Sequence, residues 1–371
     1  MPCDHGFPPL TFTPIFKEKI WGGQSLRLKL DKNIPRDLPF GESWELSGVP
    51  GDESKVLRGP FAGQTLSAIV DREGARLLGN IRHGASFPLL YKFIDANDDL
   101  SIQLHPNDQQ ARTLGLGDGG KTECWYIIDA LPETRVLCGF KEGVGPEDVK
   151  AALDAKQLPK VCNFIPVSPG DVVFVPAGTV HATLANTVLY EVQQTSDVTF
   201  RLYDWDRVDA QGKPRRLHIA EALNVLDMTF HRRHVIDPVA INDSGVFHAM
   251  RIACRYFAME EYRCEEPARW DLPLKKSFQV ITVLSGSLRV YPGPDEYHFV
   301  KGETILLPAC SDRISIRAEA RTRMLVSYVP DLVSDIISPL LRMGVSRDSI
   351  EALGGNPSCN DLIGPLKSFF S

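Results

Sequence analysis

Four polar residues between positions 103 and 181 carry donor atoms that together could hold one metal ion. Gln103 and His105 stand in SIQLHPND, Glu123 in GKTECWYII, and His181 in GDVVFVPAGTVHA. Side chains alternate between the two faces of a β-strand, so Gln103 and His105 are expected on one face. Two imidazole nitrogens, a carboxylate oxygen and an amide oxygen suit zinc and leave one coordination position open. The pattern predicts a metal-dependent enzyme with one zinc ion per chain.

Each of these residues also has an explanation that needs no metal. His181 follows a Pro-Ala-Gly-Thr turn and alone could be a surface histidine. Glu123 lies two residues from Lys121 on the same strand face and could be ion-paired with it. A carboxylate on the inward face of an apolar strand is costly unless it is paired or bound to a metal. The occurrence of all four residues together favours the metal site.

A second group of charged residues lies in LYEVQQTSDVTFRLYDWDR, residues 189–207. Glu191 is on a strand, Asp197 in the loop that follows, and Arg201 on the next strand. Their apolar, β-branched and aromatic neighbours favour a lined cavity over a solvated face. An always-protonated guanidinium with fixed donors is suited to stabilising an enediolate or holding a sugar oxygen.

The segments that must position these residues have mainly β-periodicity. Strands are expected at 87–96, 100–106 and 121–130, between 159 and 207, and from about 245 to 329. Helices are expected at 65–79, 145–158 and 214–228. Residues 108–120 are expected to form a polar turn and a glycine-rich loop, and residues 331–371 a partly helical tail.

One internal repeat indicates how the β-structure is divided. The spacing from Gly170 to Pro176 recurs from Gly302 to Pro308, but the second copy has Arg313 where the first has His181. The first copy is similar to a conserved motif of cupin barrels, and the second resembles a cupin that cannot bind metal. We therefore expect a mainly β fold with some helices, made of two cupin (jelly-roll) barrels, with the metal site in the N-terminal barrel and a degenerate second barrel. The expected division is a catalytic domain at 1–235, a degenerate barrel at 236–330 and a tail at 331–371.

Composition limits the kinds of partner. A net charge of -6 argues against a nucleic-acid-binding or anionic-membrane surface. No apolar stretch approaches the roughly 20 residues that a membrane-spanning helix needs, and the N-terminus lacks the features of a signal peptide. The eight cysteines contain no CxxC pair and are expected to be reduced, as in a cytoplasmic protein. A monomer or homodimer is expected.

Several segments together resemble one enzyme family. SIQLHPND, GKTECWYII, VPAGTVHA and EVQQTSDVTFRLYDWDR, with KEKIWGG (17–23) and GESWELS (41–47), are similar to the signature segments of type I mannose-6-phosphate isomerases. The resemblance covers about residues 1–330 and is to the compact bacterial branch, from which the tail departs.

The resemblance implies zinc ligation by Gln103, His105, Glu123 and His181, and a place near the sugar or its phosphate for Lys121, Ser101 and Lys92. Glu191, Asp197 and Arg201 would line the reacting end, with Arg201 as a catalytic residue, and Trp44 and Glu45 would border the pocket.

The implied reaction interconverts mannose 6-phosphate and fructose 6-phosphate through a cis-enediol. The base is left open among Glu191, Asp197, a metal-bound water and His105, with a carboxylate near Arg201 favoured. Two alternatives stay open: an iron-dependent cupin dioxygenase, and a non-catalytic sugar-binding cupin.

Overall fold

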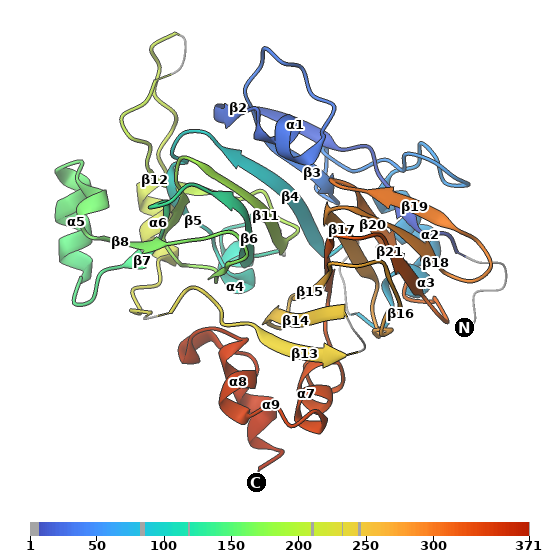
Figure 1. The fold of residues 1–371 in the computed structure, drawn as a ribbon. Helices are drawn as coiled ribbons and strands as arrows, with labels where there is room; N and C mark the ends of the chain where they lie inside the picture. The colour runs from blue at the N-terminus through green and yellow to red at the C-terminus, as the bar shows by residue number, and fades with distance from the viewer. Residues whose placement is uncertain are drawn as a thin grey trace.

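The computed structural model describes residues 7–81, 86–117, 119–208, 211–231, 233–243 and 246–370. Within these ranges the strands form four sheets, and all strand pairs are antiparallel. The sheets belong to two halves of the molecule that lie side by side (Figure 1). This arrangement confirms the expected mainly β fold with cupin-like barrels.

The first half contains a six-stranded and a five-stranded sheet. In sheet order, the six strands are β2 (Ile15–Gly23), β3 (Phe40–Leu46), β4 (Leu89–Ala96), β11 (Thr187–Gln194), β6 (Glu123–Ala130) and β9 (Val172–Val175). The five strands are β12 (Phe200–Tyr203), β5 (Ile102–Leu104), β10 (His181–Thr183), β7 (Arg135–Phe140) and β8 (Cys162–Pro166).

The second half contains a seven-stranded and a four-stranded sheet. The seven strands are β1 (Leu10–Thr11), β20 (Thr304–Leu307), β17 (Gln279–Ser285), β22 (Thr322–Tyr328), β15 (Ala258–Cys264), β14 (Val246–Ala253) and β13 (Val239–Asp243). The four strands are β16 (Ala268–Asp271), β21 (Ser315–Ala318), β18 (Ser287–Tyr291) and β19 (Tyr297–Val300). Strand β1 comes from the N-terminal segment, which therefore adds an edge strand to the second half.

The central strand of the six-stranded sheet, β11, fixes one row of site residues. Every residue of β11 is buried, and Glu191 stands opposite Lys92 of β4 and Trp125 of β6. Residues directly opposite one another across antiparallel strands point to the same face. The register therefore brings these three side chains together on the inner face.

The five-stranded sheet fixes the second row. Gln103 of β5 stands opposite His181 of β10 on one side and Arg201 of β12 on the other. The metal-ligand candidates thus come from both sheets of the first half, which is where a barrel cavity is expected.

Helices depart from the sequence predictions mainly in length. The helix expected at 65–79 is divided at Gly74, whose φ of 47° is in the left-handed region, into α2 (Leu66–Glu73) and α3 (Ala75–Leu78). The helix expected at 145–158 ends earlier, as α5 (Pro146–Asp154) followed by the 3-10 turn η1 (Leu158–Lys160), and that at 214–228 is reduced to α6 (Ile219–Val225). Helix α1 (Ser25–Leu30) also belongs to the first half.

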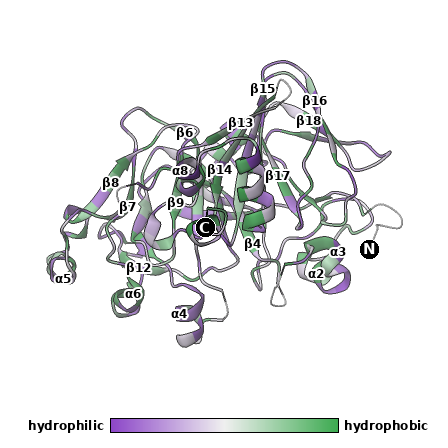
Figure 2. Ribbon diagram, turned by 90° about the horizontal axis from the view of Figure 1, so that it is seen from below, coloured by the Kyte–Doolittle hydropathy of each residue, from purple (hydrophilic) through white to green (hydrophobic). Residues whose placement is uncertain are grey.

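The prediction of a polar turn after His105 is wrong, because residues 108–113 form helix α4 (Asp108–Thr113). Asn107 accepts from the backbone N–H of Gln110, and the Gln110 side chain accepts from the backbone N–H of Asn107. This capping box begins the helix. Figure 2 shows α4 as mostly hydrophilic, in contrast to the green interior strands.

The tail is helical and well packed. It contains the π-helix η2 (Leu332–Ile337), α7 (Ser338–Arg342), α8 (Arg347–Ala352), the 3-10 turn η3 (Pro357–Cys359) and α9 (Ile363–Lys367). These elements lie together beneath β13 (Figure 1). Their buried apolar side chains belong to the largest core cluster, which spans both halves: Ile336, Ile337, Leu340, Ile350, Leu353, Leu362 and Leu366.

The expectation that all cysteines are reduced needs one correction. Cys124, Cys138, Cys162, Cys254, Cys264 and Cys359 are free, whereas Cys310 is disulfide-bonded. Cys3 lies outside the described residues. No helix in the described part of the chain has the length and apolar character needed to cross a membrane.

Candidate active site

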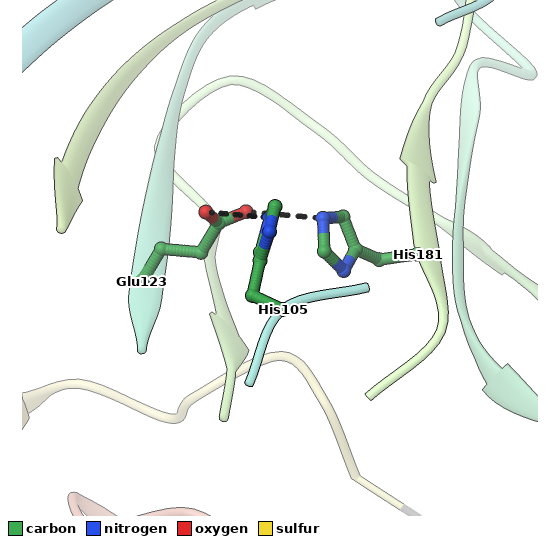
Figure 3. Close-up of side chains that lie close together, drawn as sticks. All are labelled: His105, Glu123 and His181. Carbon is green, nitrogen blue, oxygen red and sulfur yellow. Dashed lines mark ion pairs between the residues drawn. The ribbon is translucent and has the colours of Figure 1, made fainter. Parts of the chain in front are cut away.

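Three of the four predicted metal ligands converge between the two sheets of the first half. The donor atoms of His105, Glu123 and His181 all lie within 4.8 Å of one another, and each residue is only 1% exposed. Figure 3 shows the two imidazoles facing the Glu123 carboxylate. The Nε2 atoms of His105 and His181 are each 3.4 Å from a different oxygen of Glu123.

Backbone carbonyls fix the tautomer of both histidines. His105 Nδ1 lies 2.8 Å from the carbonyl oxygen of Val198, and His181 Nδ1 lies 2.9 Å from that of Thr179. A carbonyl oxygen only accepts hydrogen bonds, so each Nδ1 carries the proton and each Nε2 presents a lone pair.

The same histidines are held neutral by burial. Desolvation lowers the pKa of His181 to about 4 and that of His105 well below its usual value. Neither Nε2 atom has a hydrogen-bond partner among the described residues, although both are buried. Two neutral imidazoles with unpartnered Nε2 atoms beside a buried carboxylate are the donor set that a divalent metal ion requires, so the residues fit a metal site.

Gln103 lies next to this triad and connects it to Arg201. Its Oε1 accepts a hydrogen bond from Ser101 Oγ at 3.1 Å, and Ser101 Oγ accepts in turn from Arg201 Nε at 3.1 Å. Arg201 Nη1 also donates to the carbonyl of Arg216 at 3.0 Å. These contacts hold the guanidinium along the wall of the pocket, where burial lowers the pKa of Arg201.

On the opposite wall, Lys92 and Glu191 form a buried ion pair. Lys92 Nζ lies 3.2 Å from Glu191 Oε1, and the indole Nε1 of Trp125 donates at 3.1 Å to Glu191 Oε2 and at 3.1 Å to Glu123 Oε1. Burial raises the pKa of Glu191, and the Lys92 charge offsets this only in part. Burial lowers the pKa of Lys92, but Glu191, Glu42 and other carboxylates outweigh it and the pKa of Lys92 is raised. The surroundings therefore favour the cationic form of Lys92, whereas burial favours the neutral acid form of Glu191.

Lys121 completes the inner shell. Its Nζ lies 3.5 Å from Glu123 Oε2, and its side chain is buried. The ion pair that served as the alternative explanation for Glu123 is therefore present, and it coexists with the two histidine contacts.

A cavity of about 320 Å³ lies at this site, and of the triad it is lined by Glu123 and His181. Of the predicted site residues, it is lined by Lys92, Ser101, Gln103, Lys121, Glu123, His181, Glu191, Asp197 and Arg201. Asp197 and Thr199 contribute from the loop between β11 and β12.

Three further charged residues of the cavity were not predicted from the sequence: Lys19, Glu42 and Arg215. Glu42 lies 3.2 Å from Lys19, and although burial raises the pKa of Glu42, Lys92 and Lys19 outweigh it and keep that pKa below its usual value. Arg215 Nε donates to Asp204 at 2.7 Å. Glu42 stands in the segment GESWELS, so strand alternation could have selected it.

The structure separates the other two predicted pocket residues. Trp44 is buried beside the site: its Nε1 donates to Glu42 at 2.6 Å, and Lys92 Nζ lies 4.9 Å from its ring centroid. Glu45 points away from the cavity, where its carboxylate accepts from Lys32 at 2.7 Å and from Ser43 at 2.5 Å. Neighbouring residues on a strand face opposite sides, which accounts for the separation.

Comparison with known proteins agrees with this geometry. Residues 10–141 match the family model of the type I phosphomannose isomerase catalytic domain. The mannose-6-phosphate isomerase ManA of Bacillus subtilis is 37% identical over 301 residues, which is 81% of this chain and 93% of that protein. This chain belongs to the type I phosphomannose isomerases.

This isomerase is also similar to other mannose-6-phosphate isomerases. The mannose-6-phosphate isomerase of Streptococcus mutans is 33% identical over 300 residues, which cover 81% of this chain and 92% of that protein. A crystal structure of the mannose 6-phosphate isomerase from Bacillus subtilis matches with a TM-score of 0.79 and 33% identity, over 86% of this chain and 99% of that one. A mutant phosphomannose isomerase from Salmonella typhimurium matches with a TM-score of 0.68 at 15% identity, over 86% of this chain and 99% of that one, which shows the fold alone.

Proposed function

We propose that the protein interconverts mannose 6-phosphate and fructose 6-phosphate through a cis-enediol, and that the reaction depends on one zinc ion. The observation that carries the proposal is the buried His105–Glu123–His181 triad, with unpartnered Nε2 atoms, at the wall of a cavity rich in charged side chains. Membership in the type I phosphomannose isomerases supports the choice of substrate.

His105, Glu123 and His181 would hold the zinc, and Gln103 would supply the fourth donor through its amide oxygen. When bound, the metal would act as a Lewis acid that polarises the sugar oxygens at C1 and C2.

The charge of the cavity suits a phosphosugar. Its lining includes five cationic residues (Lys19, Lys92, Lys121, Arg201 and Arg215) and four carboxylates (Glu42, Glu123, Glu191 and Asp197). With a divalent cation added, the cavity is net positive and complements a dianionic phosphate. We assign Lys92, Lys121 and Ser101 to the sugar or its phosphate.

We assign the proton transfer between the two carbons to Glu191. A carboxyl group whose pKa is raised toward neutral pH is a better base, and its acid form a better donor, than a solvated glutamate. Glu191 would take the proton from C2 of the open-chain aldose, which leaves the negative charge on the C1 oxygen of the enediol. The proton of the C2 hydroxyl would then pass to the C1 oxygen. Glu191 would deliver its proton to C1 as the C2 oxygen becomes the ketone, so that no proton is gained or lost overall.

Arg201 would stabilise the negative charge that develops on the enediol oxygens. Its Nε–Ser101 and Nη1–Arg216 contacts fix the guanidinium in advance, so little reorganisation is needed as charge develops. Asp197, in the loop between β11 and β12, also places a carboxylate at the cavity and is the alternative base.

The test is turnover of mannose 6-phosphate by purified protein, coupled to detection of fructose 6-phosphate, before and after chelation. We expect activity to be lost with chelator and restored by zinc, at one metal per chain. A His181→Ala variant should lose both the metal and the activity. Zinc-loaded, folded protein without turnover would refute the proposed reaction, and full activity after complete metal removal would refute the zinc dependence.

A further inference from the structure

The backbone around Lys121 is held at three consecutive amide groups. The N–H of Gly120 donates to Asp108 Oδ1 at 2.8 Å, that of Lys121 to the carbonyl of Pro106 at 3.0 Å, and that of Thr122 to Gln194 Oε1 at 2.9 Å. Two of these three acceptors are side chains rather than strand partners. The segment enters β6 from a loop, and these side chains add to the sheet contact in which the Gln194 N–H of β11 donates to the carbonyl of Thr122 at 3.1 Å.

Asp108 is the centre of this support. Its Oδ1 also accepts from Gln194 Nε2 at 2.9 Å, and its Oδ2 accepts from Tyr256 OH at 2.9 Å. Because Gln194 donates through Nε2 to a carboxylate and accepts through Oε1 from Thr122, its amide orientation is fixed by its partners. We call Asp108, Gln194 and Tyr256 the Lys121 brace.

Tyr256 belongs to the second half of the molecule. It lies in the turn between β14 and β15, next to Arg255, whose backbone N–H and Nε donate to Asp361 of the tail at 2.9 and 2.6 Å. The brace therefore connects the cavity of the first half to the second half and, one residue further, to the tail.

Gly120 allows the close approach that the brace requires. A Cβ atom at this position would lie 2.5 Å from the backbone of both Asn107 and Asp108. No side chain fits there, so Gly120 is packed directly on the first turn of α4. This end of the glycine-rich loop expected from the sequence is therefore held by specific contacts.

We propose that Asp108 and Gln194 are positioning residues for Lys121, and that Tyr256 of the second half fixes Asp108 in turn. The inference rests on the proposed role of Lys121 at the sugar or its phosphate. Lys121 reaches the cavity from the segment just before β6, whose first residue, Glu123, pairs with Gln193 of β11 and Val175 of β9. A displacement of about 1 Å at a catalytic group can lower a rate about 100-fold.

The first experiment measures kcat, KM and zinc content of the full-length, zinc-loaded enzyme with Asp108→Ala, Lys121→Ala and both substitutions together. We expect Asp108→Ala to lower kcat about 10- to 100-fold with one zinc retained per chain. In the Lys121→Ala background the same substitution should cost less than about 2-fold, because a residue that acts through Lys121 has nothing left to position. Asp108→Asn keeps an acceptor for Gly120 and should recover most of the turnover.

The second experiment compares two tyrosine hydroxyls, each of which donates a hydrogen bond to a carboxylate in the opposite half of the molecule. Tyr256→Phe removes the bond to Asp108, and Tyr126→Phe removes a bond of equal length, 2.9 Å, to Glu261. We expect Tyr256→Phe to lower kcat about 3- to 10-fold and Tyr126→Phe to leave it unchanged. Equal effects of the two substitutions would overturn the role of Tyr256.

The outcomes separate the brace from the function on which it rests. If Lys121→Ala keeps wild-type turnover, the assigned role of Lys121 is wrong and the brace has no catalytic consequence. If Lys121→Ala loses turnover but Asp108→Ala does not, or if their losses multiply in the double variant, the brace is wrong while the proposed reaction stands.

Discussion

At the scale of single residues, Glu191 has the surroundings that best suit proton transfer. Its carboxyl is buried, accepts from Trp125 and is paired with Lys92. Glu191→Gln keeps the size and the acceptor oxygen but cannot take up a proton, so we expect kcat to fall about 10²- to 10⁴-fold with the metal retained. Near-native turnover would eliminate Glu191 as the base, and a matching loss in Asp197→Asn alone would assign that role to Asp197.

Lys121 allows a second prediction at this scale. Lys121→Ala removes the cation 3.5 Å from Glu123 but none of the donor atoms of the three proposed metal ligands. We expect phosphosugar turnover to be lost while zinc content, measured by atomic absorption, stays at one per chain. Should zinc content collapse instead, the ammonium group supports the ligand shell, and its assignment to the substrate is wrong.

The residues of the triad could be predicted from the sequence because their signal is local. Gln103 lies on β5 and His105 follows the end of that strand directly, and His181 follows a turn that directs it back to the barrel. Lys19 and Arg215 had no such signal, because each comes from a segment outside residues 92–201 and is brought to the cavity only by tertiary packing. The sequence predicts Trp44 and Glu45 at the pocket, although strand alternation places Glu42 and Trp44 on one face of β3 and Glu45 on the other, and it is Glu42 that lines the cavity.

At the scale of elements, the strands were predicted better than the helices. A strand such as β6 is one apolar run, whereas α4 has six residues and buries only Ala111. Its evidence in the sequence is the capping box from Asn107 to Gln110 rather than a period of 3.6 residues. The sequence predicts the tail only as partly helical, because its apolar residues are divided among several short helical segments, each too short to show a periodic pattern.

Strand β15 yields a prediction on pH-dependent stability. Glu260 is buried in the second half and accepts from His248 at 2.8 Å, Tyr262 at 2.8 Å and Lys275 at 2.7 Å. Burial raises the pKa of Glu260, but Lys275 and His248 outweigh it and the pKa lies far below the usual 4.5.

Because the pKa of Glu260 is lower in the folded state than in the unfolded state, its contribution to stability is complete above the unfolded value. It is lost as the pH falls below that value toward the folded pKa. We expect the free energy of unfolding in urea to decrease when the pH is lowered from 6 to about 3.5. Glu260→Gln should lower stability at pH 7 by about 3–5 kcal/mol and reduce this pH dependence. An unchanged pH profile in Glu260→Gln would contradict the argument.

At the scale of the whole molecule, the two halves are joined through their repeated segments. The carbonyl of Gly302 in the second copy of the repeat accepts from Lys32 of the first half at 2.5 Å. The carbonyl of Gly170 in the first copy accepts from Arg251 of the second half. Each copy thus binds a cation from the opposite half, and Tyr190 OH lies 2.6 Å from Thr282 Oγ1 between them. The second copy of the repeat has Arg313 where the first has His181, yet both copies make this contact between the halves.

The tail extends this joining and gives the last prediction. The N–H of Ala253 in β14 donates to the carbonyl of Leu353, whose side chain is 0% exposed in the core shared by both halves. Removing a fully buried leucine side chain costs its transfer free energy and leaves a cavity, so Leu353→Ala should lower the free energy of unfolding by about 2–5 kcal/mol. Met343→Ala, at a tail position 60% exposed, is the control and should change it by less than about 0.5 kcal/mol. Both are measured by urea denaturation of the zinc-loaded protein, followed by circular dichroism and by loss of turnover. Because the tail packs into the common core, the two signals should shift together in Leu353→Ala. A loss of tail helicity at low urea, with the turnover transition unmoved, would mean that the tail unfolds separately and contributes nothing to the stability of the active half.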